Sequence, residues 1–308
     1  MKRFLLPVLF LLIVALGACG NKQDEPAKEE APAKEEASGT ITYESEDGPV
    51  EVPADPKRVI ALSFAGNIMA LDVDIVGVDS WSKMNPRFDS VLGEIEEVSD
   101  ENIEKIIELD PDLIIGYNTA KNIDKLKEIA PTVTFTYGKV DYLTQHIEIG
   151  KLLNKEEEAT KWVEDFKQRA QAAGEEIKAK IGEDTTVSVV ENFDKQLYVY
   201  GDNWGRGTEI LYQEMKLAMP EKVKEMALEA GYYALSTEVL PEFAGDYMIL
   251  SKFNAADNSF METETYKNIP AVKNHQVFEV NGEEFYFNDP LTLDYQLEFF
   301  KEHFLETK

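Results

Sequence analysis

An uninterrupted amphipathic stretch in the middle of the chain constrains the fold more than any other sequence feature. Residues 155–181 contain no proline and one glycine, Gly174. Apolar side chains recur there at helical spacing, namely Ala159, Trp162, Val163, Phe166, Ala170, Ala173 and Ile177. This spacing places them on one face of an α-helix. At the standard rise per residue the helix is about 40 Å long, so the parts before and after it are expected to fold as separate lobes.

Short apolar strands alternate with helical segments on both sides of this stretch. A hairpin is expected at residues 41–43 and 50–52, around Gly48-Pro49. In the first part we predict strands at 58–62, 75–78, 112–117 and 132–137, and helices at 65–71, 103–109, 121–129 and 142–153. In the second part we predict strands at 186–190, 196–200, 247–250 and 277–280, and helices at 208–215 and from Leu291 onward. This alternation favours a parallel α/β sheet covered on both faces.

The predicted fold class is therefore α/β, with two lobes joined by one long helix. We expect a first lobe at residues 40–154, a connecting helix at 155–182 and a second lobe at 183–308. The cleft between two such lobes is the default position of a ligand site.

The N-terminus has the pattern of a bacterial lipoprotein signal. Basic residues follow Met1, an apolar run extends from Phe4 to Leu16, and Leu16-Gly17-Ala18-Cys19 ends in the only cysteine of the chain. We predict a signal peptide at residues 1–18 and lipidation of Cys19. The alternative is an ordinary secretory signal in which Cys19 is incidental. Residues 19–39 then form an acidic, low-complexity tether rich in Lys, Glu, Ala and Pro.

Charge and composition exclude several functions. The chain of 308 residues has 31 Lys and Arg against 59 Asp and Glu, a formal net charge of −28. Because nucleic-acid affinity depends on cationic neutralisation of phosphates, no nucleic-acid partner is expected. The three histidines, His146, His275 and His303, are far apart in the sequence. No cluster typical of a zinc or copper site is therefore present, and we expect no cofactor and no metal ligated by the protein.

The most unusual segment for ligand binding is residues 198–207, Tyr-Val-Tyr-Gly-Asp-Asn-Trp-Gly-Arg-Gly. It ends a predicted strand and begins a predicted helix, and its glycines permit tight turns that project Trp204 and Arg206 from the sheet edge. It lacks the Gly-Lys-Ser/Thr of a phosphate loop and the last glycine of a dinucleotide fingerprint. A structural turn with an incidental tryptophan is the alternative; we favour a ligand loop, because an exposed Trp beside an exposed Arg is costly without a ligand.

No motif in the sequence supports catalysis. Ser80-Trp81-Ser82-Lys83 matches the Ser-x-x-Lys of serine acyl transferases, but the companion Ser-Asp-Asn and Lys-Thr-Gly elements are missing. No Gly-x-Ser-x-Gly elbow occurs either. We therefore expect no catalytic residues and no enzyme activity; a surface-anchored α/β hydrolase remains the less favoured alternative.

Several motifs in the same order resemble those of a known family. They are the lipoprotein signal, the acidic tether, Asp55-Pro56-Lys57-Arg58-Val59, residues 109–115 (Leu-Asp-Pro-Asp-Leu-Ile-Ile), Ile129-Ala130-Pro131-Thr132-Val133, residues 200–207, and residues 285–290 (Phe-Tyr-Phe-Asn-Asp-Pro). Together they resemble the iron(III)-siderophore substrate-binding lipoproteins of ABC importers in Gram-positive bacteria, and most closely those that bind iron(III)-hydroxamates. The resemblance covers the chain from about residue 41. It implies two Rossmann-like lobes, a rigid connecting helix, a shallow cleft and no catalysis.

The resemblance also implies which residues contact the ligand. Tyr137, Tyr198, Trp204 and Arg206 match family positions that contact the hydroxamate, and Tyr286 stands where close relatives carry tryptophan, which leaves the preferred siderophore open. From the first lobe we add Trp81 and Tyr117, either of which equally suits a core position. Since a siderophore surrounds Fe³⁺ with six of its own oxygens, the pocket needs aromatic walls and a fixed donor such as Arg206.

Partners and location follow from the same resemblance. A surface glutamate on each lobe, Glu104 and Glu238, is expected to contact the membrane permease, which works with an ATPase. The protein is expected to be a monomer on the outer face of the cell membrane, attached by its lipid. Another cargo on the same scaffold, such as a ferric catecholate, ferric citrate, haem or cobalamin, remains open. The continuous connecting helix predicts only modest closure on binding.

Overall fold

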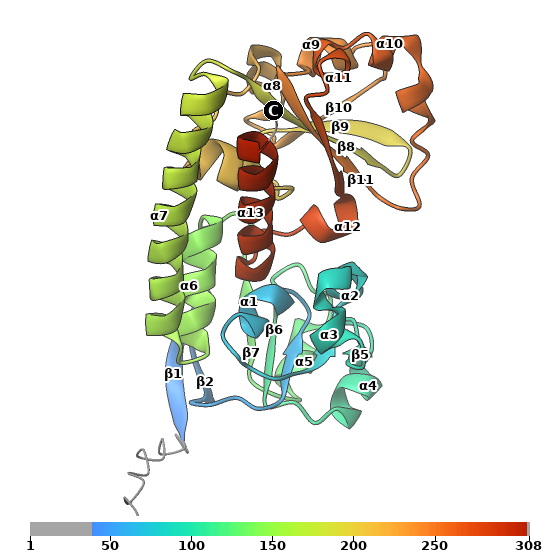
Figure 1. The fold of residues 1–308 in the computed structure, drawn as a ribbon. Helices are drawn as coiled ribbons and strands as arrows, with labels where there is room; N and C mark the ends of the chain where they lie inside the picture. The colour runs from blue at the N-terminus through green and yellow to red at the C-terminus, as the bar shows by residue number, and fades with distance from the viewer. Residues whose placement is uncertain (1–38, 307–308) are drawn as a thin grey trace, which may run out of the picture. The chain divides into compact units, whose positions relative to one another are not determined.

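The computed structural model describes residues 39–306, which form two α/β lobes connected by one long helix (Figure 1). The predicted fold class is confirmed. The first lobe contains β1 (Thr40–Ser45), β2 (Gly48–Pro53), β3 (Val59–Ala61), α1 (Ala65–Met69), β4 (Ile75–Val78), α2 (Ser80–Met84), the 3₁₀-helix η1 (Pro86–Phe88), α3 (Asp89–Leu92), β5 (Glu96–Glu97), α4 (Ile103–Glu108), β6 (Leu113–Tyr117), α5 (Ile123–Lys127), β7 (Thr132–Phe135) and α6 (Tyr142–Leu152). Each helix and strand predicted there is present, with ends that differ by a few residues.

The sheet of the first lobe is parallel throughout, in the order β5-β4-β3-β6-β7. Strands β3 and β6 lie at its centre, and the side chains of Val59 and Ala61 belong to a different apolar cluster from that of Ile60 between them. Successive side chains of a strand point to opposite faces, so both faces of this sheet are buried. The chain leaves the centre first toward β4 and later toward β7. Ligands of open α/β sheets bind at such a point, beyond the carboxyl ends of the two central strands.

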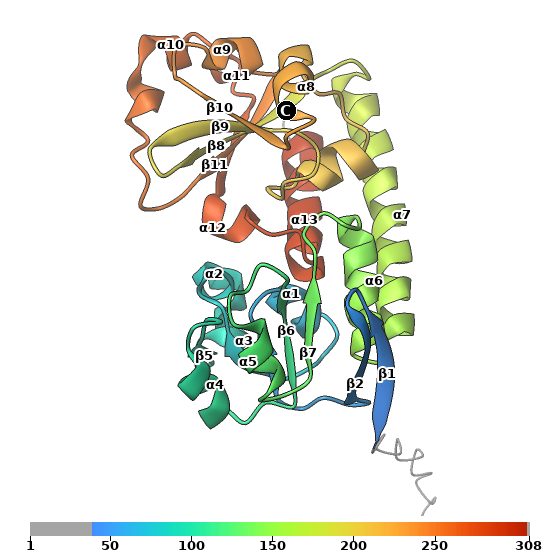
Figure 2. The same ribbon diagram turned by 180° about the vertical axis from the view of Figure 1, so that it is seen from behind.

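The hairpin of β1 and β2 is antiparallel, with Tyr43 opposite Val50. The Tyr43 hydroxyl donates a hydrogen bond to Glu148 of α6 over 3.3 Å. In both views the hairpin lies beside α6, at the end of the first lobe away from the second (Figure 2). It therefore covers α6 and takes no part in the cleft.

The connecting helix is α7 (Glu156–Ile181), as the sequence pattern predicts. Six of the seven apolar side chains of the predicted face are buried and the seventh, Trp162, is half-buried; Phe166, Ala170 and Ile177 join the core of the second lobe. Gly174 lies where a Cβ atom would be only 2.5 Å from the Cα atom of Met215. The one glycine of the helix is thus required by the close approach of a second-lobe segment.

The second lobe contains β8 (Val187–Phe193), β9 (Gln196–Tyr200), the π-helix η2 (Glu209–Glu214), α8 (Glu221–Ala227), β10 (Tyr232–Leu235), α9 (Leu240–Phe243), β11 (Tyr247–Lys252), the 3₁₀-helix η3 (Ser259–Glu262), α10 (Glu264–Lys267), α11 (Pro270–Lys273), β12 (Val277–Asn281), α12 (Gly282–Phe285) and α13 (Pro290–Glu306). Its sheet has the order β10-β9-β8-β11-β12. Strands β8, β11 and β12 run parallel, but β9 and β10 pair antiparallel to their neighbours.

The second sheet therefore differs from the parallel sheet that we expected, for a local reason. Asp194 and Lys195 both adopt left-handed backbone angles and turn β8 directly into β9 as a hairpin. Such a short connection allows only antiparallel pairing. The helix predicted at residues 208–215 is also different, because η2 is a π-helix in which Met215 N–H donates to the carbonyl of Ile210. Such helices are rare and occur often at functional sites.

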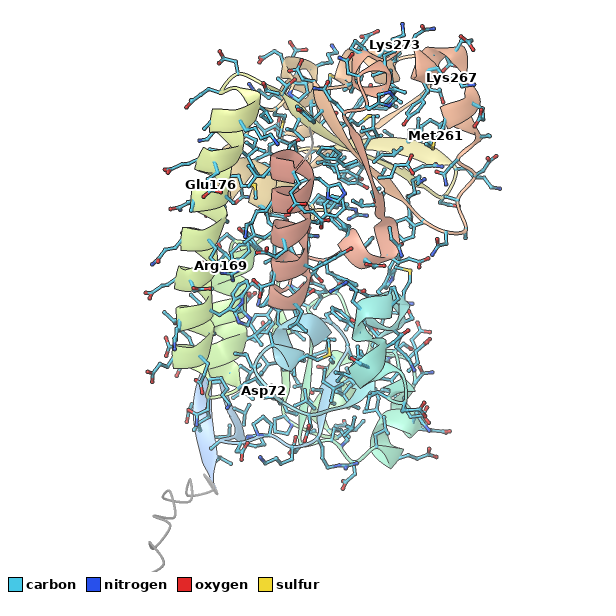
Figure 3. The ribbon with its side chains drawn as sticks, in the orientation of Figure 1. Asp72, Arg169, Glu176, Met261, Lys267 and Lys273 are labelled. Carbon is cyan, nitrogen blue, oxygen red and sulfur yellow. The ribbon has the colours of Figure 1, made fainter. Side chains whose placement is uncertain are left out.

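Helix α13 packs along α7 and is joined to it by an ion pair. Arg169, which Figure 3 labels on α7, contacts Asp165 on its own helix and Asp294 of α13, at 2.6 and 2.7 Å. The indole N–H of Trp162 donates to the same Asp294 over 3.1 Å. The connecting helix α7 is thus supported by α13 of the second lobe, which packs against it.

Candidate ligand-binding site

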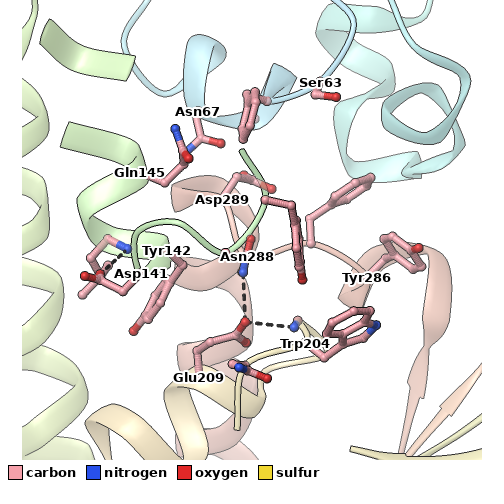
Figure 4. A pocket seen from close by; sticks show the side chains of 18 of the residues that line it. Ser63, Asn67, Asp141, Tyr142, Gln145, Trp204, Glu209, Tyr286, Asn288 and Asp289 are labelled. Carbon is pink, nitrogen blue, oxygen red and sulfur yellow. Dashed lines mark hydrogen bonds between the residues drawn. The ribbon is translucent and has the colours of Figure 1, made fainter. Parts of the chain in front are cut away.

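A cavity of about 1220 Å³ lies between the two lobes, and both lobes line it. From the first lobe come the segment after β3, which includes Ser63, and Tyr117 at the end of β6. The first lobe also contributes Trp81 and the segment that leads from Tyr137 into α6. From the second lobe come the loop before η2 and residues 286–289, and two side chains of α7 also line the cavity. Figure 4 shows these groups converging from both lobes. The cavity therefore lies where the strand order of the first sheet reverses, as the fold predicts.

The loop before η2 has an unusual backbone. Gly205, Arg206 and Gly207 have φ angles of 69, 58 and 80°, so three consecutive residues are left-handed. Glycine adopts this conformation without strain, and arginine does so at a cost. The Thr208 side chain holds the turn, since its Oγ1 lies 2.8 Å from the carbonyl oxygen of Gly205 and accepts from the N–H of Trp204.

Arg206 is buried, and this corrects the expectation that it is an exposed side chain. Only 5% of its surface is accessible. Its Nη2 lies 2.8 Å from Oε1 of Glu191, and its Nε contacts both carboxylate oxygens at 3.1 and 3.2 Å. Glu191 lies within the buried strand β8, where an unpaired carboxylate would be very costly. The ion pair explains how both charges are tolerated.

The environment of this ion pair fixes the guanidinium in place. Glu191 also accepts hydrogen bonds from the hydroxyls of Tyr200 and Ser251, each over 2.7 Å. The guanidinium carbon of Arg206 lies 4.0 Å from the ring centre of Tyr286 and 4.8 Å from that of Tyr200. Arg206 still lines the cavity, so it offers a rigid donor at the cavity wall.

Aromatic side chains form the walls, and two pairs meet across the cleft. Tyr137 of the first lobe contacts Trp204 of the second, with ring centres 5.5 Å apart and an edge-to-face arrangement. Trp81 stacks on Tyr286 with ring centres 5.1 Å apart. Tyr117 extends the first wall, 5.9 Å from Tyr137. All five rings line the cavity, so the structure brings together these predicted residues.

Tyr198 does not line this cavity, unlike the other predicted contact residues. It points from β9 toward Tyr232 of β10, with ring centres 5.9 Å apart, and Tyr232 lies 5.1 Å from Trp204. Tyr198 therefore supports Trp204 through Tyr232. The reason is its position along the strand. Tyr198 and Tyr200 share one face of β9, but Tyr198 lies two residues before the end of the strand, and the cavity lies beyond that end.

Several polar groups at the cavity were not predicted from the sequence. Glu209 is 1% exposed and accepts hydrogen bonds from the N–H of Gly205 and the amide of Asn288, both over 2.9 Å. Burial raises its pKa. Tyr142 of α6 donates its hydroxyl to Glu214 of η2 over 3.2 Å, which is a polar contact between the lobes. Asn288 belongs to the motif at residues 285–290, but nothing in that local sequence indicates that its side-chain amide donates to Glu209.

The two glutamates expected to contact a permease are both on the surface. Glu104 lies in the first turn of α4 and is exposed. Glu238 is exposed between β10 and α9, and hydrogen bonds from Ser236 and from its own backbone hold its pKa below the usual value. One therefore lies on each lobe and neither lines the cavity.

Two other observations concern membranes and metals. In residues 39–306, no helix has the length and apolar character that a membrane crossing requires. The same residues contain no group of three or more His, Cys, Asp or Glu side chains placed to hold a metal ion. Cys19, the signal peptide and nearly all of the tether lie outside the described residues.

Two α/β lobes on a helical connector, with an aromatic cleft between them, define a ligand-binding protein of the two-lobed type. The chain belongs to the periplasmic binding protein family, whose sequence model matches residues 63–283. Membership in this family of extracytoplasmic, substrate-binding proteins identifies a binding protein and not an enzyme.

Individual relatives show which members of this family are similar to the chain. The chain is 36% identical to the iron(3+)-hydroxamate-binding protein FhuD of Bacillus subtilis (strain 168), over 95% of this chain and 94% of the relative. Among solved structures, the FhuD protein from S. pseudintermedius matches with a TM-score of 0.79 and 36% identity, covering 88% of this chain and 99% of that one. FhuD2 from Staphylococcus aureus with bound ferrioxamine B matches with a TM-score of 0.76 and 34% identity, covering 82% and 99%. These relatives confirm the resemblance inferred from the sequence motifs.

Proposed function

We propose that the protein captures a ferric hydroxamate siderophore in the cleft and delivers it to an ABC importer. The observation that carries the proposal is the cleft itself, a cavity of about 1220 Å³ whose lining includes the five predicted aromatic rings and one fixed guanidinium. A cavity of this size exceeds the usual range of small-molecule sites, roughly 300–1,000 Å³. It therefore suits a large, folded chelate better than a single metal ion. The names of the similar proteins support the hydroxamate class.

The chemistry of the walls suits a ligand whose iron is already coordinated. Rings offer apolar contact area to the organic shell of such a chelate. The contacts of Arg206 to Glu191 and to the carbonyl oxygen of Trp204 engage its Nε, Nη1 and Nη2 atoms. Each Nη atom carries a second N–H, which remains available to an iron-bound hydroxamate oxygen. The iron is cargo in this proposal, and no side chain ligates it.

The proposal includes the place and partners of the protein. Lipidation of Cys19 attaches it to the outer face of the cell membrane, where as a monomer it meets the permease of an importer driven by an ATPase. The sequence pattern at residues 16–19 supports the anchor, and membership of the family supports the importer.

Ligand titration tests the proposed function. Quenching of tryptophan fluorescence is measured with ferric hydroxamates, ferric catecholates, ferric citrate, haem and cobalamin. We expect a ferric hydroxamate to bind most tightly, and Trp81 and Trp204 to report binding because both line the cavity. Tightest binding of another chelate would replace the hydroxamate class, and chemical turnover of any of them would contradict the proposal.

The exposed glutamates give a second test, which separates delivery from capture. We expect Glu104→Ala combined with Glu238→Ala to abolish uptake of the ferric siderophore by cells, because complementary surface charge orients a partner. Affinity for the ligand in solution should stay unchanged, since neither residue lines the cavity. Loss of ligand affinity in the purified double variant would contradict this assignment.

A further inference from the structure

Glu209 is a buried carboxyl group at the ligand cavity. It lines the cavity although only 1% of its surface is accessible. Figure 4 shows it beneath the pocket, with hydrogen bonds to Asn288 and to the backbone beside Trp204. A buried carboxyl at this place acts on a ligand through its charge more than through direct contact.

The neighbours of Glu209 accommodate a charged and a neutral carboxyl equally well. In the charged form, Oε1 accepts from Gly205 N–H and the Asn288 amide, and Oε2 accepts from the Thr208 hydroxyl over 3.0 Å. In the neutral form, a proton on Oε2 is donated to Thr208 Oγ1 across the same distance. The Thr208 hydroxyl then donates to the carbonyl oxygen of Gly205, 2.8 Å away. Both forms leave every one of these atoms with a partner, because in the charged form the Gly205 carbonyl oxygen still accepts from the Thr208 N–H over 3.0 Å.

The charges nearby do not fix one of the two forms. Arg206, on the same loop, is already paired with Glu191. From the first lobe, Tyr142 donates its hydroxyl to Glu214 and Tyr137 is a neutral phenol whose pKa is raised by burial and by the charge of Glu209. The remaining charged groups that line the cavity are Asp79, Lys139, Asp141, Lys167, Asp202, Glu214, Lys216 and Asp289. No cation within this set makes an ion pair with Glu209 within 4 Å.

We propose that Glu209 is a charge-selecting group whose proton is released when a cationic ligand binds, so that the cleft prefers ferric hydroxamates bearing a pendant ammonium group. The inference rests on the proposed function and adds the charge of the ligand to it. In the ligand-free protein, burial raises the pKa of Glu209, so its carboxyl keeps a proton to a higher pH than usual. A ligand cation favours the carboxylate and lowers that pKa again.

The direction of the pH dependence follows from linkage. Between the lower pKa of the complex and the higher pKa of the free protein, binding of a cationic ligand releases a proton. Affinity for that ligand therefore rises with pH through this window and levels off above it. Below the window the carboxyl is neutral in both states and the preference disappears. A neutral ligand gains nothing from the carboxylate, so its affinity does not follow this curve.

A matched pair of ligands tests the inference. Ferrioxamine B carries a pendant ammonium group, and acetylation of its amine gives a neutral ligand with the same iron centre. Both are titrated by calorimetry from pH 5 to 8, in two buffers of different ionisation enthalpy. We expect the wild type to prefer the cationic ligand by about tenfold at pH 8, which is at the low end of the coupling found for close charge pairs. We also expect it to release a proton on binding this ligand in the part of the pH range where the affinity rises with pH.

Three variants isolate the contribution of Glu209. In Glu209→Gln the side-chain amide donates to Thr208 as the neutral acid would, so we expect equal affinity for both ligands and no proton release. Glu176→Gln makes the same charge change on the outer face of α7 (Figure 3), and it should behave as the wild type does. In Asn288→Ala the carboxylate loses a donor, which moves the pH window upward.

The outcomes separate this inference from the proposed function. If neither hydroxamate binds the wild type, the proposed function and this inference both fail. If both ligands bind with equal affinity at every pH, or if Glu209→Gln keeps the wild-type preference, the charge inference alone is overturned. Should Glu209→Gln not fold, the proton release of the wild type still decides the question, since zero release with ferrioxamine B contradicts it.

Discussion

The two lobes contribute to the cleft in physically different ways. The first lobe contributes rings that contact other rings, such as Phe64 with Tyr117 at 4.6 Å and Tyr117 with Tyr137 at 5.9 Å. The second lobe contributes the rings of Trp204 and Tyr286, and in addition it holds buried charges by hydrogen bonds, with Glu191 as their centre. Ring contacts tolerate replacement, whereas a buried network is strongly destabilised when one member is removed. We therefore expect mutations in the second lobe to affect folding and binding together, and those in the first lobe to affect binding alone.

The largest effect is expected from Arg206→Ala. It leaves Glu191 buried without its partner, which costs about 3–5 kcal/mol of unfolding free energy. Urea denaturation followed by circular dichroism measures the loss. The double variant Arg206→Met with Glu191→Gln removes both charges and should recover a large part of it. A loss below about 1 kcal/mol for Arg206→Ala would mean that the second lobe is no more sensitive than a typical surface site.

The first lobe has a buried titratable group of a different kind, His146. Burial lowers its pKa from 6.5 to about 4. The folded state therefore binds its proton less readily than the unfolded state, so stability is complete above pH 6.5 and falls as the pH drops toward 4. The loss amounts to about 3 kcal/mol.

Denaturation of the wild type and of His146→Gln at several pH values measures this contribution. The slope between pH 6.5 and 4 should flatten in His146→Gln, because the group that takes up the proton is gone. The exposed His275→Gln is the matched control and should keep the wild-type slope. An unchanged slope in His146→Gln would show that acid sensitivity comes from another group.

The smallest effects on stability are expected at the aromatic walls, where the comparison between lobes is sharpest. Tyr137 is 56% exposed, so Tyr137→Ala should change the unfolding free energy by less than about 0.5 kcal/mol and weaken binding by about 1 kcal/mol. Trp204 packs against the core of the second lobe, so Trp204→Ala should weaken binding by about 2 kcal/mol and also lower the melting temperature. Calorimetry and thermal denaturation measure the two quantities. Equal melting temperatures for both variants would contradict the difference between the lobes.

Much of the architecture was predictable because periodic patterns are local. The apolar spacing of residues 155–181 identifies α7, and the short apolar runs identify the central strands of both sheets. The antiparallel pair β9 and β10 was not predictable in the same way. Strand β10 is a four-residue edge strand, and its pattern of exposed and buried residues depends on its pairing with β9. A sequence this short does not indicate which strand it pairs with.

The candidate site was predictable in its aromatic part but not in its charged part. Trp204, Tyr137 and Tyr286 belong to motifs that indicate a binding loop or a wall, and they do line the cavity. Glu191 is the one charged residue of the buried strand β8, and its charge alone was a signal that a buried partner exists. Glu209 is one of 59 acidic residues, and nothing near it in the sequence distinguishes it.

The sequence by itself determined the alternation of strands and helices, the single connector and the glycine-rich loop, since each depends on residues close together in the chain. Only the tertiary structure decided that Arg206 is neutralised by Glu191 and that Glu209 meets Asn288, 79 positions away. The physical reason is that the state of a charge depends on its burial and on its partners, and folding brings those partners from distant parts of the chain.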